Sequence, residues 1–246
     1  MAVDLATLLP FRRARPKARV RLVCLPFAGG GAATFKEWAA HLPDWVDVCA
    51  VELPGRGTRF GEAAVDDPRP LIDDLRADLA PLTDLPTVLF GHSLGAWLAF
   101  ALARGGFPAR ALVASGAKAP HLLPERRYGD LPREELVAEL RRFGGTPDEI
   151  LDDAEMVDLF LPMIRADFRL AERLVATTAD ELGCPLTVLA ATDDAETSAA
   201  DAAAWELHAK AGFRLVPMAG GHFFVVSRPT AVLTEVRRVL DATLAP

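Results

Sequence analysis

Six short apolar runs, rich in valine and leucine, constrain the fold of this chain more than any other feature. Each run is continuously apolar and does not alternate with polar residues, which is typical of strands buried on both faces of a parallel sheet. The runs are VRLVCL (20–25), VDVCAVEL (46–53), TVLFG (87–91), RALVAS (110–115), PLTVLAA (185–191) and FRLVPM (213–218). They predict the strands of a mostly parallel sheet.

Segments with helical periodicity separate most of these runs. Their apolar positions are Leu71, Ile72, Leu75, Leu79 and Leu82; Trp97, Phe100 and Ala101; and Val232, Leu233, Val236, Val239 and Leu240. The alternation of strands and helices predicts an α/β protein with a doubly wound sheet. A chain of 246 residues with 51% hydrophobic residues is large enough to form one such domain, and we expect a single domain over 1–246.

The segment from about 118 to 182 interrupts this alternation. It contains helical patterns such as ELVAELRRFG and EMVDLFLPMIRADF but no convincing strand. A helical insertion between two strands is a candidate lid over an active site. Pro162 lies inside one of these patterns, so we expect it to kink or break a lid helix. Asp167 is expected to form a hydrogen bond within the lid.

The sequence GHSLG (91–95) lies between an apolar strand and a helical pattern. This context predicts a nucleophile elbow, in which a serine on a strained turn is exposed above the edge of the sheet. Gly91 and Gly95 allow strand and helix to approach closely because they have no Cβ atom. Ser93 is the candidate nucleophile, and the Leu94 backbone N–H is a candidate oxyanion donor.

A serine nucleophile needs a base that removes its proton. His222 lies in MAGGHFFVV, between the last predicted strand and the last helix, where a hydrolase sheet presents its base. His92, inside the elbow, is expected to pack or to form a hydrogen bond. His41, His121 and His208 are expected on solvated surfaces.

The base is oriented by a carboxylate, which we expect in the loop after the preceding strand. In that loop, TDDAETS, Asp193 and Asp194 compete, and Asp194 is favoured because Ala191 occupies the glycine position of the common G-x-x-D spacing. The order Ser93, Asp194, His222 is that of α/β-hydrolases.

The loop LPFAGGGAAT follows the first long strand and is expected to supply the second oxyanion donor, the backbone N–H of Phe27 or Ala28. Three consecutive glycines can also indicate phosphate binding. The chain lacks the Walker lysine and the G-x-G-x-x-G pattern, so we do not expect a nucleotide site.

Several motifs together carry a family resemblance. They are PFAGGGA, ELPGRG, GHSLGA, FGGTP, LPMIRADF and GGHFF, in this order. Over about residues 20–240 the chain resembles the type II thioesterases of polyketide and nonribosomal peptide pathways, which have the α/β-hydrolase fold. LPMIRADF together with GGHFF is more specific than GHS-x-GA, which many hydrolases share.

The resemblance implies an editing hydrolase that releases stalled or incorrect acyl groups from the phosphopantetheine arm of acyl or peptidyl carrier proteins. It places the catalytic residues on Ser93, Asp194 and His222, and the oxyanion amides on the Phe27–Ala28 turn and Leu94. Leu94 stands where the family commonly has methionine, and AERLVATT lacks the aromatic residues expected after the lid. The alternatives are a general carboxylesterase or lipase, a chain-terminating cyclase, and a non-catalytic binding protein.

If the insertion covers the site, its apolar residues shape the acyl chamber. The candidates are Leu159, Phe160, Met163, Ile164 and Phe168. Carrier proteins are typically acidic, so docking would need a local basic patch. The candidate patches are Arg126 and Arg127, Arg141 and Arg142, and the basic arm 12–19.

Composition excludes several other classes of function. The net charge of −7 argues against general binding to nucleic acid or to membrane surfaces. Cys24 and Cys49 lie in strand-like runs and are expected to be inert, and without C-x-x-C we expect neither a metal nor a redox cofactor. The N-terminus has its charges in the wrong order for a signal peptide, and no run approaches the roughly 18 apolar residues of a membrane helix. We therefore expect a cytoplasmic protein.

Overall fold

The computed structural model describes residues 3–122 and 126–245. Within these residues, a six-stranded sheet has the order β2-β1-β3-β4-β5-β6, and all neighbouring strands are parallel. The strands are β1 (Val20–Leu25), β2 (Val46–Ala50), β3 (Thr87–His92), β4 (Ala109–Ser115), β5 (Leu186–Ala191) and β6 (Phe213–Met218). The predicted strands are confirmed, although β2 ends at Ala50, three residues earlier than expected.

Burial explains the continuous apolar runs and one departure from them. Every residue of β1, β2 and β3 is buried, as expected for strands covered on both faces. Strand β6 lies at the edge of the sheet, and only Met218 among its residues is buried. The expectation of burial on both faces was therefore wrong for β6.

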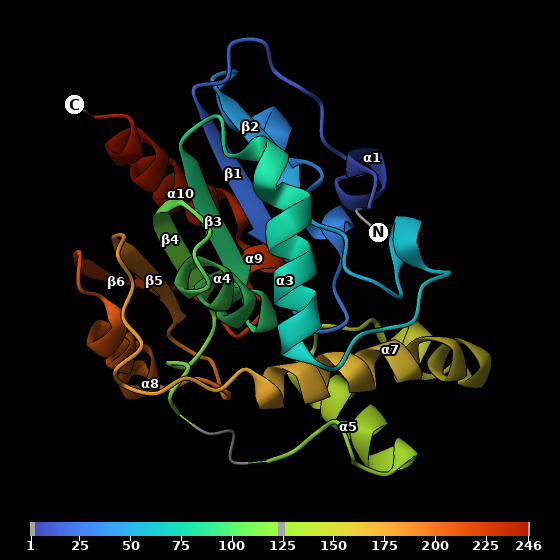
Figure 1. Cartoon of the computed structure of the whole chain (residues 1–246). Coiled ribbons are helices and arrows are strands. Elements are labelled where there is room, and N and C mark those ends of the chain that lie inside the picture. The colour runs from blue at the N-terminus through green and yellow to red at the C-terminus, as the bar shows by residue number, and fades with distance from the viewer. Residues whose placement is uncertain (1–2, 123–125, 246) are drawn as a thin grey trace.

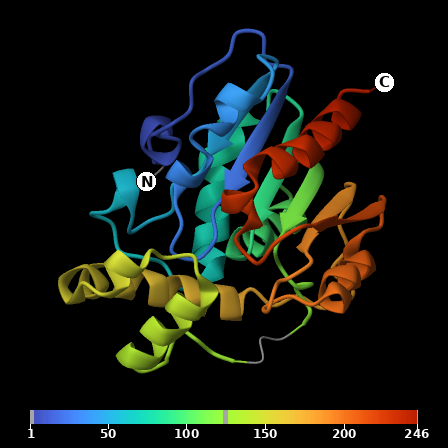
Figure 2. The same cartoon turned by 180° about the vertical axis from the view of Figure 1, so that it is seen from behind.

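Helices cover both faces of the sheet, which confirms the doubly wound α/β architecture. One face carries α3 (Pro68–Leu79) and α4 (Leu94–Arg104), and the other carries α9 (Phe224–Ser227) and α10 (Pro229–Thr243) (Figures 1 and 2). Each face has its own apolar core, one including Leu75 and Leu98 and the other including Val236. The smaller elements are α1 (Leu5–Leu8), η1 (Ala32–Phe35), α2 (Trp38–His41), η2 (Gly57–Arg59), η3 (Ala80–Leu82), α8 (Ala199–Ala203) and η4 (Ala204–His208).

The strand order determines where the loops gather. The chain moves outward from β1 to β2 and then returns to place β3 on the other side of β1. In open α/β sheets, ligands bind at the carboxyl ends of the strands beside such a reversal. Leu25 of β1 pairs with Gly91 of β3 in the register, so the loops after these two strands begin at the same level.

In the described part of the segment between β4 and β5 lie three helices, which confirms the helical insertion. We call α5 (Arg133–Phe143), α6 (Asp148–Leu151) and α7 (Ala154–Arg173) the cap helices. They lie together at the carboxyl ends of the strands (Figure 1). They share an apolar cluster of their own that includes Leu136, Leu140 and Leu161. Of the predicted segment 118–182, residues 123–125 lie outside the described part of the chain.

Pro162 does not break a cap helix, so of the two expected effects, a kink or a break, the break is wrong. Helix α7 continues through Pro162 from Ala154 to Arg173. Proline removes the hydrogen bond to the carbonyl of residue i−4, here Asp158. Both Pro162 and Asp158 are exposed, so water can bind that carbonyl in place of the missing N–H group.

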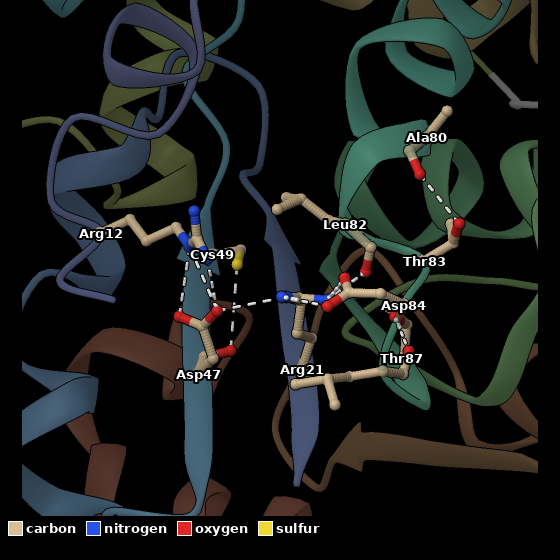
Figure 3. Close-up of polar contacts among 10 residues, drawn as sticks. Arg12, Arg21, Asp47, Cys49, Ala80, Leu82, Thr83, Asp84 and Thr87 are labelled. Carbon is tan, nitrogen blue, oxygen red and sulfur yellow. Dashed lines mark hydrogen bonds and ion pairs between the residues drawn. The ribbon is translucent and has the colours of Figure 1, made fainter. Parts of the chain in front are cut away.

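The basic arm 12–19 is anchored to the sheet. Asp47 of β2 is buried, and its carboxylate accepts hydrogen bonds from Arg12 Nη2 at 2.8 Å and from Arg21 Nε at 3.2 Å (Figure 3). Arg21 also pairs with Asp84. Arg15 donates to the carbonyl of Pro43 at 2.6 Å. The interpretation of this arm as a docking patch is therefore wrong for Arg12 and Arg15, which hold the arm in place.

Two buried cysteines lie where they were expected, whereas one histidine is buried against expectation. Cys24 and Cys49 are buried, and burial raises the pKa of the Cys49 thiol to about 12, in keeping with inert core thiols. His208 is completely buried, contrary to its expected surface position. Its Nδ1 lies 2.6 Å from the Asp180 carbonyl oxygen and its Nε2 lies 2.8 Å from His121 Nδ1.

No helix in the described part of the chain combines the length and the apolar character needed to span a bilayer.

The close approach of α4 to β1 generates a stability prediction. A Cβ atom on Gly95 would lie 2.1 Å from the Leu25 carbonyl oxygen, a backbone atom that cannot rotate away. Overpacking typically costs about 1–3 kcal/mol, and a backbone clash belongs at the upper end, so Gly95→Ala should lower the free energy of unfolding by about 3 kcal/mol or more. Urea unfolding measures this. Gly61→Ala is the control, because no atom lies within 4 Å of its added Cβ; similar losses in both variants would contradict the prediction.

The buried His208 predicts a stability that falls in acid. Burial, and secondarily the charge of His121, lowers the pKa of His208 below 6.5, so the unfolded chain binds a proton that the folded chain does not. Above pH 6.5 the neutral His208 leaves the free energy of unfolding unaffected by this proton. As the pH falls below 6.5, the free energy of unfolding declines by up to about 1.4 kcal/mol per pH unit for one proton. Between pH 7.5 and 5.5, the urea midpoint should fall less in His208→Gln than in the wild type. His41→Gln, at an exposed position, should retain the wild-type slope.

Candidate active site

Ser93 lies on a strained turn between β3 and α4. Its backbone has φ 54° and ψ −119°, and it is the only non-glycine residue with a positive φ in the described part of the chain. Such a conformation costs about 1–3 kcal/mol and persists only where the surroundings enforce it. The Ser93 N–H donates to the Ser115 carbonyl oxygen at 2.8 Å, which fixes the turn against the end of β4.

The glycines on either side allow the tight packing that the elbow requires. A Cβ atom on Gly91 would lie 1.9 Å from the Gly95 carbonyl oxygen. Real side chains do not tolerate such contacts, so both positions need glycine. The result is the strand–turn–helix geometry of a nucleophile elbow, with Ser93 at its tip.

Three backbone N–H groups are available to a substrate oxygen. Phe27, Ala28 and Leu94 line one cavity together with Ser93. Among the described residues, no acceptor takes the backbone N–H of Phe27, Ala28 or Leu94. Leu94 is the first residue of α4, where the helix dipole favours negative charge. We propose that the Leu94 N–H and the N–H of either Phe27 or Ala28 form an oxyanion hole.

His222 and Asp194 form a hydrogen-bonded pair on adjacent loops. His222 Nδ1 lies 2.8 Å from Asp194 Oδ2, and the Asp194 side chain is completely buried. The other carboxylate oxygen accepts the Glu196 N–H at 2.8 Å. Asp193, the competing residue, is exposed, and its backbone N–H binds the Gly220 carbonyl oxygen at 3.0 Å, joining the two loops. The structure thus brings Asp194, and not Asp193, to His222.

Ser93 and His222 line the same cavity, but no hydrogen bond joins Ser93 Oγ to a described residue. Catalytic hydrogen bonds are often long in free enzymes and tighten when substrate binds. We propose Ser93, His222 and Asp194 as nucleophile, base and orienting carboxylate.

His92 lies beside the pair as a neutral, buried side chain. Its ring centroid is 5.3 Å from that of His222, and its Nδ1 lies 2.9 Å from Ser115 Oγ. Burial, and secondarily the charge of His222, lowers the pKa of His92 well below 6.5. His92 therefore stays uncharged and does not repel a protonated His222. Its packing and hydrogen bonding agree with expectation.

The cavity has a volume of about 680 Å³ and extends from Ser93 into the cap helices. Phe160, Met163, Ile164 and Phe168 of α7 line it, as predicted. Leu159 does not line the cavity and is 51% exposed, because it shares a helix face with the exposed Glu155 and Pro162. Lining side chains that the sequence did not reveal include Trp97, Tyr128, Phe143 and Val157. Trp97 had a detectable signal, since it lies one helical turn after Ser93.

One polar expectation for the cap needs correction. Asp167 does not bond within the cap; it accepts hydrogen bonds from Arg56 and from the Gly29 N–H.

The arginines proposed for docking at the cap are engaged in ion pairs: Arg141 with Asp148 and Asp152, Arg142 with Glu139 and Glu196, and Arg126 with Glu135 and Glu139. These pairs neutralise much of the positive charge of Arg126, Arg141 and Arg142, and a docking patch at these residues stays a prediction.

Residues 3–122 and 126–245 contain no cluster of three or more histidine, cysteine, aspartate or glutamate side chains arranged to bind a metal ion.

Comparisons with known proteins decide the family. A family model described as "Thioesterase domain" matches residues 20–240. The chain belongs to the thioesterase family. The thioesterase is 32% identical over 235 residues to the gramicidin S biosynthesis protein GrsT of Aneurinibacillus migulanus, covering 93% of this chain and 92% of that protein. The predicted resemblance to type II thioesterases is thereby confirmed.

Solved structures of high similarity support the same assignment. The thioesterase RedJ from the prodiginine pathway of Streptomyces coelicolor superposes with a TM-score of 0.84 at 35% identity, covering 90% of each chain. The type II thioesterase BorB from the borrelidin cluster gives a TM-score of 0.83 at 38% identity, covering 93% of this chain and 95% of that chain. These similarities extend across both the sheet and the cap helices.

The two neighbouring aspartates provide a matched test of the site. In Asp194→Asn the amide no longer stabilises a protonated His222, and by analogy with serine hydrolases kcat should fall on the order of 10³–10⁴-fold. Asp193→Asn should change kcat less than about threefold, because Asp193 does not touch His222. Steady-state hydrolysis of a small acyl thioester measures both, with thermal unfolding to verify that each variant folds. Comparable losses in the two variants would contradict the assignment of Asp194.

Proposed function

We propose that this thioesterase hydrolyses acyl groups from the phosphopantetheine arm of acyl or peptidyl carrier proteins, and so removes stalled or incorrect intermediates in polyketide or nonribosomal peptide synthesis. The observation that carries the proposal is the convergence of Ser93, His222 and Asp194 on one largely apolar cavity within a chain of the thioesterase family. The proposal includes the cytoplasmic location expected from the sequence.

In the proposed mechanism, Ser93 Oγ attacks the thioester carbonyl carbon while His222 Nε2 takes the hydroxyl proton. Asp194 accepts the Nδ1–H of His222, holds the ring in the required tautomer and stabilises the imidazolium that forms. The Leu94 N–H and the N–H of Phe27 or Ala28 stabilise the oxyanion of the tetrahedral intermediate.

Collapse of this intermediate breaks the carbon–sulfur bond. The thiol leaves with the carrier and takes its proton from His222, while the acyl group stays on Ser93 as an ester. A water molecule then loses a proton to His222 and attacks this ester; the acid leaves, and His222 returns the proton to Ser93 Oγ. The histidine acts as base and then as acid in each half-reaction, so it must be neutral at the start of each.

The cavity suits a tolerant acyl-binding role. Phe160, Met163, Ile164 and Phe168 present an apolar surface without fixed hydrogen-bond donors. Met163 has an unbranched, flexible side chain that adapts to irregular shapes. An editing enzyme must accept many acyl groups, and a surface of this kind selects them weakly.

Removing the nucleophile tests the proposed function. Ser93→Ala should lower kcat on the order of 10⁴–10⁶-fold, because no other group forms the acyl-enzyme. Hydrolysis is followed on carrier proteins loaded with a panel of acyl groups, and mass spectrometry locates the adduct formed by a fluorophosphonate. Ser227→Ala is the control, since Ser227 is exposed and absent from the cavity lining, and it should retain activity and labelling at Ser93.

Several outcomes would overturn the proposal. Adduct on a residue other than Ser93 contradicts the mechanism. Faster hydrolysis of a matched oxygen ester than of the thioester indicates a general carboxylesterase, and release of lactone in place of acid indicates a cyclase.

A further inference from the structure

A buried ion pair joins helix α7 of the cap to the loop after β2. Arg56 Nη1 and Nη2 each lie 2.7 Å from a different carboxylate oxygen of Asp167, in a two-pronged arrangement. The side chains are only 8% and 2% exposed. Asp167 belongs to α7, and Arg56 belongs to the loop between β2 and α3. The pair therefore connects segments that are 111 residues apart in the sequence.

The same pair binds the backbone of the Phe27–Gly30 turn at two points. Asp167 Oδ2 accepts the Gly29 N–H at 2.8 Å, and Arg56 Nη1 donates to the Gly30 carbonyl oxygen at 2.8 Å. The turn is closed internally by the Gly30 N–H, which donates to the Phe27 carbonyl oxygen at 2.9 Å. These contacts fix the turn at Gly29 and Gly30, while no described residue accepts the N–H group of Phe27 or Ala28.

We propose that Asp167 and Arg56 are positioning residues that hold the second oxyanion amide in place, so that the oxyanion hole is complete only when α7 lies against the loops at the carboxyl ends of the strands. This inference rests on the proposed function, because it assigns a role to the Phe27–Ala28 turn in hydrolysis. Neither side chain acts on substrate directly; each acts through the peptide groups of Gly29 and Gly30.

The chemistry of the Arg56–Asp167 ion pair indicates that it positions the Phe27–Gly30 turn and does not merely attach the cap to the rest of the protein. Two buried charges lose their hydration, and well-packed apolar side chains of similar volume attach surfaces equally well or better. A charged pair supplies what apolar contact cannot, namely short hydrogen bonds with a fixed direction. Ile164, one turn earlier on α7, would lie 3.5 Å from a Cβ atom on Gly29 and already provides apolar contact at this place.

The link also makes the turn sensitive to the cap. If α7 moves away, the Gly29 N–H loses its acceptor and Arg56 loses its partner carboxylate. The turn then has only its internal bond, and its free amides lose their fixed direction. Acyl transfer is thereby restricted to the state in which the cap covers the cavity.

Replacing Asp167 with leucine tests the inference, because its effect on transition-state stabilisation can be measured separately from its effect on ground-state binding. In Asp167→Leu, kcat for a small acyl thioester should fall on the order of 10²–10³-fold, the loss typical of one oxyanion donor. Affinity for a trifluoromethyl ketone, which adds to Ser93 and places its oxygen in the oxyanion hole, should fall by the same factor. Affinity for a thioether analogue without a carbonyl group should change less than about twofold.

Two further variants serve as a conservative substitution at Asp167 and as a control elsewhere on α7. Asp167→Asn keeps an amide oxygen that can accept the Gly29 N–H, so it should recover part of the lost kcat. Asp158→Leu alters an exposed carboxylate on the same helix, paired with Arg133, and should leave kcat unchanged. A fall in thioether affinity that matches the fall in kcat would overturn the inference, because it would show a general loss of the cavity.

A double variant separates positioning from folding. Asp167→Leu alone leaves the Arg56 charge buried without a partner, which destabilises the protein. Combining it with Arg56→Met removes both charges and should restore the thermal midpoint while kcat stays low. Recovery of kcat together with the midpoint would assign the pair a structural role only.

The Ser93→Ala experiment distinguishes failure of the proposed function from failure of the positioning role of Asp167 and Arg56. If turnover survives in Ser93→Ala, the proposed function fails. If Ser93→Ala is inactive while Asp167→Leu retains wild-type kcat and ketone affinity, the proposed function stands and only the present inference fails.

Discussion

The contact between the backbone of Gly95 and the carbonyl groups of Leu25 and Pro26 is the constraint on which the rest of the site depends. It brings the first turn of α4 against the end of β1, at the reversal of strand order between β1 and β3. Ser93 is held with a positive φ as a consequence. The start of α4 and the loop after β1 can then contribute N–H groups to the same cavity. The proposed nucleophile and the proposed oxyanion donors are therefore products of one packing arrangement.

The parts of the structure that could be predicted are those whose signals are local. Buried parallel strands require continuous apolar runs, and the elbow requires glycines at two fixed distances from its serine. Asp194 and His222 could be found because parallel strands bring their following loops to one edge, and sequence order then assigns each loop. Residue type and position along the chain were sufficient in each case.

The parts that could not be predicted depend on partners distant in the sequence. The role of Asp167 becomes visible only when Arg56 and Gly29 are seen beside it. His208 looked like a surface residue because its contacts, with His121 and the Asp180 carbonyl, come from outside its own element. Leu159 faces solvent, contrary to the prediction, because five apolar residues in one helix cannot all face the same way, and Leu159 shares its face with the exposed Glu155 and Pro162.

The cap helices have an apolar cluster of their own, separate from the two cores that pack on the sheet. Substitutions in this cluster would reshape the proposed acyl chamber mainly at the expense of packing within the cap, while the two cores on the sheet keep their contacts. Selection can therefore alter which acyl groups are accepted without rebuilding the machinery that cleaves them. The hydrogen bonds of Asp167 and Arg56 limit that independence, because a cap that is displaced too far would no longer bind the Phe27–Gly30 turn.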